Sequence, residues 1–209
     1  MGTIMSGKTA AFETFMRSMK IGFEEWHDGI SYNLQALAAL PPDELAEVEA
    51  LLIARRGQDW RDTEALASIA SDRVAAALEQ GLHASDCAAR LTAGEQLQAL
   101  GRLPDMGALI VDGLEHGSFG DGFAQALRLA AEYPREEVRA YLLRACLHAP
   151  GEKAVHFAAL LYHLHGKSAE AFDIGMRPFF LRFAGDDQAQ RRQAYGELCA
   201  LIGVAADIE

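Results

Sequence analysis

The stretch VAAALEQGL, residues 74–82, decides the fold because two similar stretches follow it along the chain. MGALIVDGL occupies residues 106–114 and VRAYLLRAC occupies residues 138–146, so each copy begins 32 residues after the one before. Apolar residues recur within every copy at helical spacing. The three stretches are therefore expected to be the second helices of successive helical pairs.

The first helices of these pairs keep the same step. They are LTAGEQL at 91–97, FAQALRL at 123–129 and VHFAALL at 155–161, each with a small residue in the middle that permits close helix approach. The segment that starts at Trp60 matches the first of them at an offset of 31. Part of this agreement follows from helix geometry itself, because 32 residues are nearly nine helical turns.

Helix breakers argue against one continuous helix. They recur at Gly101 with Pro104, at 117–122, at Pro134, at Pro150 with Gly151 and at Gly166, which limits each helix to about 10 to 14 residues. A short helical pair that is apolar on both sides cannot cover both sides by itself, so neighbouring pairs stack. We therefore expect an all-α, right-handed superhelix, with the second helices on its concave surface.

Before these pairs, three apolar stripes predict amphipathic helices within the first 56 residues. They are Phe12, Phe15, Met16 and Met19, then Trp26, Ile30, Leu34 and Leu37, then Leu45, Val48 and Leu52. Residues 2–9, GTIMSGKT, also fit the phosphate-loop pattern G-x-x-x-x-G-K-[ST]. Met1 leaves no room for the strand that such a loop requires, so we expect a disordered or alternative-start N-terminus and no nucleotide hydrolase.

The segments DWRDTEALASIASDRVAAALEQGL (59–82) and REEVRAYLLRACL (135–147) resemble bacterial HEAT-like repeats, which place an acidic and an apolar residue at the start of short paired helices. The resemblance covers residues 59–165 and implies an interaction scaffold. Residues 1–58 and 166–209 are then helical caps of one continuous solenoid domain. The chain departs from the family at GMRPFFLRF, residues 175–183, where Pro178 would break the last second helix.

Charge and composition exclude several classes of partner. Thirty acidic and nineteen basic residues give a net charge of −11, which repels nucleic acid and anionic lipid and favours a basic protein. We find no secretion signal and no apolar span of eighteen residues. Cys87, Cys146 and Cys199 are too far apart for a metal or redox pair, so we expect reduced, buried thiols and a cytoplasmic protein.

Enzymes with related repeats have requirements that this chain does not meet. Iron-dependent hydroxylases of this fold use repeated His-Glu pairs, and no His-Glu dipeptide occurs here. HEAT-like DNA glycosylases need a positive surface for phosphates, and nothing identifies the pigment site of a chromophore lyase. The stretch HGSFGDG, residues 116–122, reads as a turn between repeats rather than a ligand-binding loop.

The histidines do not predict a metal site. His156 and His163 share a helical stripe but lie two turns, about 10.5 Å, apart, which is too far for one metal ion, so no metal or other cofactor is expected. His83, His116 and His148 lie near the ends of the second helices, where a cation complements the helix dipole. Asp72, Asp105 and Glu136, at the starts of those helices, are expected to cap them.

The leading hypothesis is a non-enzymatic module that binds a basic protein, with an immunity or inhibitor protein for a basic toxin as one form of it. The candidate binding surface comprises Arg177, Phe179, Phe180, Phe183, His156 and His163. Two alternatives stay open. One is an enzyme or small-ligand binder that uses a groove near His156, His163 and Asp173, and the other is a structural adaptor that docks through the three phenylalanines.

Overall fold

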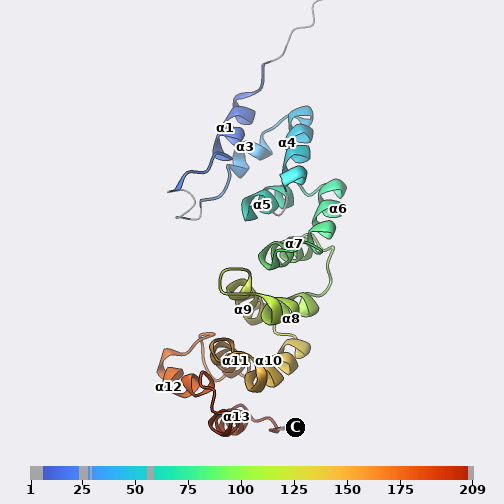
Figure 1. The fold of residues 1–209 in the computed structure, drawn as a ribbon. Helices are drawn as coiled ribbons and strands as arrows, with labels where there is room; N and C mark the ends of the chain where they lie inside the picture. Colours follow the sequence, from blue (N-terminus) through green and yellow to red (C-terminus); the bar gives the residue numbers. More distant parts are fainter. Residues whose placement is uncertain (1–6, 24–27, 29, 56–58, 207–209) are drawn as a thin grey trace, which may run out of the picture. The chain divides into compact units, whose positions relative to one another are not determined.

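The all-helical prediction is confirmed. The structure, a computed structural model, describes residues 7–23, 28, 30–55 and 59–206, with only the backbone of Trp60. Within these residues it has twelve α-helices, two short 3-10 helices and no strand (Figure 1). The chain divides into two compact units, residues 1–105 and 106–209, and each is considered by itself. Trp26 and residues 2–6 of the phosphate-loop pattern lie outside the described residues.

The first unit consists of short helices, most of which begin at a polar capping residue. The helices are α1 (Ala10–Ser18), α3 (Leu34–Ala38), α4 (Pro42–Arg55), α5 (Trp60–Ile69), α6 (Asp72–Gly81) and α7 (Cys87–Ala99). A side chain accepts a hydrogen bond from a first-turn amide at the start of five of them, and the capping residues are Thr9, Asn33, Asp59, Ser71 and Asp86. Such caps satisfy amides that have no partner inside the helix.

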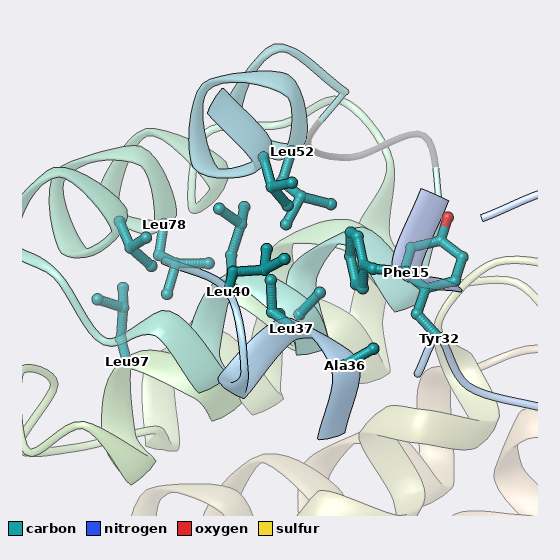
Figure 2. Packing of buried hydrophobic residues seen from close by; sticks show 12 residues of the cluster. Phe15, Tyr32, Ala36, Leu37, Leu40, Leu52, Leu78 and Leu97 are labelled. Atoms are coloured by element: carbon teal, nitrogen blue, oxygen red, sulfur yellow. The ribbon is translucent and has the colours of Figure 1, made fainter. Parts of the chain in front are cut away.

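The core of the first unit gathers the apolar stripes of all these helices (Figure 2). Phe15 of α1 and Leu52 of α4, both from predicted stripes, are fully buried, and Leu78 brings in α6. The Phe15 and Tyr32 rings meet edge to face with their centroids 6.0 Å apart. Burying a side chain of this size contributes about 1.5–3 kcal/mol, so helices too short to fold alone are stable together.

A buried polar cluster, which the sequence did not predict, lies beside this core. Asp62 is fully buried and accepts hydrogen bonds from the Tyr32 hydroxyl at 3.0 Å and from Nε of Arg55 at 3.2 Å. Burial raises the pKa of Asp62, although both hydrogen bonds oppose that change. Burial and the nearby Asp62 charge raise the pKa of Tyr32 to about 12. Arg61, also buried, donates to the carbonyl of Ile30, so the cluster joins the segment before α3 to α4 and α5.

The second unit continues with helical pairs and ends in shorter elements. They are α8 (Gly107–His116), α9 (Phe123–Glu132), α10 (Glu136–His148), α11 (Gly151–Leu164), the 3-10 helix η1 (Ile174–Met176), α12 (Arg177–Phe180), the 3-10 helix η2 (Leu181–Phe183) and α13 (Gln188–Ile202). Helices α8 to α11 contact their neighbours as two pairs and also contact across the pairs, α8 with α10 and α9 with α11. The first unit shows α4 with α6 and α5 with α7 in the same relation. The continuous superhelix and the boundaries at 58/59 and 165/166 stay predictions.

The turn 117–122 closes on itself, as the turn interpretation expects. Ser118 and Asp121 exchange backbone hydrogen bonds of 2.9 and 3.0 Å, and the amide of Phe123 donates to the Ser118 carbonyl at 3.1 Å. Gly122 takes a φ of 78°, which favours glycine. These three amides are used by the turn itself and are not directed at a ligand.

The predicted acidic caps were wrong in their details. The hydroxyl of Ser71 caps α6, and Asp72 is the first helical residue, one position too late to cap it. Asp72 instead pairs with Arg102 at 2.6 Å. Helices α8 and α10, which follow Asp105 and begin at Glu136, have no side-chain capping bond.

Two cations satisfy carbonyls at the ends of α8 and α10 instead. Nζ of Lys153, on α11, donates to the carbonyls of Leu114 and Glu115 at 3.0 and 2.8 Å. Arg191, a buried residue of α13, donates to the carbonyl of Ala149 at 2.9 Å. A positive charge is favourable at the negative end of a helix dipole, so each cation fastens a later helix to the end of an earlier one.

The segment 175–183 covers the end of α11. Pro178 lies in the first turn of α12, where its missing amide costs nothing, and Phe180 and Phe183 are fully buried. Helix α11 contacts α12, η2 and α13. Its first residue, Gly151, lies so close to the chain that an added Cβ would stand 2.0 Å from the carbonyl oxygen of Ala184.

This approach makes Gly151→Ala destabilising. The backbone at Ala184 has to move, at a cost of about 1–3 kcal/mol in the free energy of unfolding, measured by urea denaturation. Gly196→Ala in α13 is the matched control, because a Cβ there meets nothing within 4 Å and alanine favours a helix by about 1 kcal/mol. A Gly151→Ala protein as stable as the control would contradict the close packing of α11 on Ala184.

Candidate functional site: the His156 groove

A groove of about 500 Å³ opens beside the first two turns of α11. We call it the His156 groove. Helix α11 contributes Glu152, Val155 and His156, and the segment after it contributes most of the remaining lining, namely Phe172, Ile174, Arg177 and Leu181. Residues distant in sequence therefore meet here because the chain after α11 folds back along it.

His156 is held by aromatic rings rather than by hydrogen bonds. Its ring centroid lies 5.6 Å from that of Phe119, 6.0 Å from that of Phe123 and 5.5 Å from that of Phe172. Neither ring nitrogen has a hydrogen-bond partner among the residues that the structure describes. Burial lowers the pKa of His156, and the negative charge of Glu152 opposes this only in part. The imidazole is therefore neutral at pH 7 and retains one donor and one acceptor.

Large apolar side chains around His156 remain exposed. Ile174 is 72% exposed and Leu181 is 48% exposed, and both line the groove. Phe119, whose ring contacts His156, is 51% exposed. Exposed apolar side chains that gather at one hollow, rather than lying scattered, are typical of a binding site.

The structure brings together two of the six predicted surface residues, His156 and Arg177, which both line the groove. Phe180 and Phe183 are fully buried, so their rings belong to the interior of the second unit. Phe179 is partly buried beneath the guanidinium of Arg182, 5.4 Å from its ring centroid.

The proposed partners of His156 in catalysis lie elsewhere. Nδ1 of His163 is 3.0 Å from the carbonyl oxygen of Ser168, so this histidine ties down the loop after α11. Oδ1 of Asp173 accepts a hydrogen bond from the Gly175 amide at 2.8 Å and caps η1. Neither lines the groove, whose ionisable residues are Glu152, His156 and Arg177.

Sequence reasoning missed Phe172, Ile174 and Leu181. The available signal was Pro178, which predicted a break in the last helix. A break in a helix implies short elements, and short elements leave some apolar side chains uncovered. The sequence alone does not say which side chains these are.

Metal and membrane searches are both negative over the described ranges. No group of three or more His, Cys, Asp or Glu residues there is arranged to hold a metal ion. No helix there is long and apolar enough to cross a membrane. Cys87, Cys146 and Cys199 are free and buried, and burial raises the pKa of the Cys146 thiol.

Comparison of the chain with protein-family models, with curated proteins and with solved structures gives no significant match. The HEAT-like resemblance therefore stays a prediction that rests on the residues quoted for it. The chemistry of the groove follows from its own residues: a neutral imidazole forms one or two hydrogen bonds, and apolar walls take up an apolar group.

The lowered pKa of His156 predicts a loss of stability in acid. An unfolded histidine takes up a proton near its ordinary pKa of 6.5, whereas folded His156 resists protonation until a lower pH. The free energy of unfolding should therefore fall as the pH drops below about 6.5, and it should fall less in His156→Phe. Urea denaturation at about pH 7.5 and about pH 5.5 measures the difference.

His165 has a pKa lowered by burial and by Arg139, so it contributes a loss of the same sign that remains in the variant. Equal losses in the wild type and in His156→Phe would show that His156 is not kept neutral by the rings around it.

Proposed function

We propose that this chain is a non-enzymatic protein-binding module whose His156 groove receives an apolar side chain of a basic protein partner. The observation that carries the proposal is the exposure of Ile174 and Leu181 beside a neutral histidine that has no hydrogen-bond partner in the described structure. An apolar anchor in a groove with a few polar groups around it is how many protein interfaces obtain their affinity.

The charge of the chain supports a basic partner. Residues 1–105 carry sixteen acidic and nine basic side chains, and residues 106–209 carry fourteen and ten. The resulting field accelerates association with a positively charged protein and opposes nucleic acid and anionic membranes. A cytoplasmic immunity or inhibitor protein that occludes a basic toxin fits this description.

The frame that we propose is a HEAT-like solenoid. Contacts between neighbouring pairs within each unit, α5 with α7 and α9 with α11, support it. In this proposal the pairs at 59–165 form one right-handed superhelix, and residues 1–58 and 166–209 are its caps. Such a frame holds a binding surface in place without the cost of ordering it on association.

Affinity capture from the source organism's lysate tests this function. The wild-type chain should retain one predominant basic protein at about 0.05 M salt and release most of it at about 0.5 M salt, because salt screens the charges. Leu181→Asp should abolish capture at either salt concentration. Leu201→Asp is the matched control, because Leu201 is a similarly exposed leucine (44%) on α13 and does not line the groove.

Equal loss of the partner in the Leu181 and Leu201 variants would refute the groove as the binding surface. Capture that survives high salt would favour the apolar adaptor over the charge-driven module. If no protein is captured at either salt, the small-ligand or enzymatic alternative takes precedence, with His156 and Glu152 as its ionisable pair.

A further inference from the structure

A second cavity of the second unit, about 370 Å³ in volume, shares no lining residue with the His156 groove. It lies among the end of α8, the last turns of α10 and the start of α11. We call it the Tyr141 pocket. Its polar lining consists of Glu115, Tyr141, Arg144, His148 and Lys153, and the remainder is alanine and proline.

Three polar side chains of the pocket have no partner in the described structure. The Tyr141 hydroxyl, the Arg144 guanidinium and the His148 imidazole form no hydrogen bond or ion pair there. The Tyr141 ring is held edge to face by Phe157, with centroids 5.9 Å apart, so its hydroxyl is positioned at the pocket. A phenol and a guanidinium both donate hydrogen bonds, so an acceptor satisfies them.

Lys153 adds a positive charge whose position is fixed. Its Nζ donates to the carbonyls of Leu114 and Glu115 and lies 4.9 Å from the centroid of the Phe123 ring. Because those contacts already hold the ammonium group, it needs no rearrangement to stabilise a nearby anion. Arg144 and Lys153 outnumber the one carboxylate of the pocket, Glu115, in a chain whose net charge is −11. The pocket therefore favours an anion.

We propose that the Tyr141 pocket binds a small organic monocarboxylate. The carboxylate accepts hydrogen bonds from the Arg144 guanidinium, whose fork matches its two oxygens, and from the Tyr141 hydroxyl. The apolar part of the ligand packs on Ala145 and Pro150. A phosphate dianion is disfavoured because Glu115 repels two charges more strongly than one. The volume suits a small metabolite.

Calorimetric titration of the full-length protein with benzoate, benzamide and phenyl phosphate tests this site. At low salt, benzoate should bind saturably, neutral benzamide should not bind, and phenyl phosphate should bind more weakly than benzoate. Arg144→Gln should weaken benzoate binding about tenfold or more, and Tyr141→Phe, which keeps the ring on Phe157, should weaken it about threefold to tenfold. Arg177→Gln in the His156 groove is the control and should leave the affinity unchanged.

Several results would overturn the proposal. Benzamide that binds as well as benzoate would show that the pocket does not recognise charge. Equal losses in the Arg144 and Arg177 variants would reduce the effect to general surface charge. Tighter binding of phenyl phosphate would contradict a carboxylate site, and no saturable binding of benzoate up to about 10 mM would exclude one. Each result leaves the proposed protein-binding function unchanged, because the two sites share no residue.

Discussion

The structure depends on one constraint: its helices are too short to be stable unless each is covered by neighbours. The longest helix in the described part of the chain, α13, has 15 residues, and isolated helices shorter than about 12–15 residues are marginal in water. Contacts between neighbouring pairs, α4 with α6 and α8 with α10, supply the burial that single helices lack. Cations such as Arg191 then satisfy carbonyls at helix ends that packing leaves without partners.

Helix α11 shows how this constraint produces the two candidate sites. Seven of its fourteen residues are buried, and it contacts α9, α10, α12, η2 and α13. Its first turns are the part that remains open, with Glu152 and His156 in one cavity and Lys153 in the other. The following segment cannot form another long helix, since Pro178 starts a new one, and the short elements leave Ile174 and Leu181 uncovered. Both sites thus arise where the helical packing ends.

The sequence predicted the helices well because the cause is local. The quoted repeat stretches all lie on helices, and Phe15, Val48 and Leu52 of the predicted stripes are fully buried. Features that depend on tertiary packing were not predictable. Asp62 looked like an ordinary acidic residue near a helix start, yet it is fully buried and bonded to Tyr32, thirty residues earlier.

The candidate site was predictable only in part, for the same reason. His156 and Arg177 were identified from the sequence, but Phe180 was placed on a surface and is buried. The face that a four-residue helix presents depends on what covers it, and periodicity does not give that information. The contact of His156 with Phe119, across thirty-seven residues, likewise exists only in the folded chain.

Photo-crosslinking in cells of the source organism tests the central claim, that the His156 groove is the functional surface. A benzophenone amino acid replaces Ile174, which is exposed at the groove, or Leu201, which is exposed away from it. The account predicts that the Ile174 position crosslinks to one basic protein and that the Leu201 position does not. The same products from both positions, or none from Ile174, would contradict it.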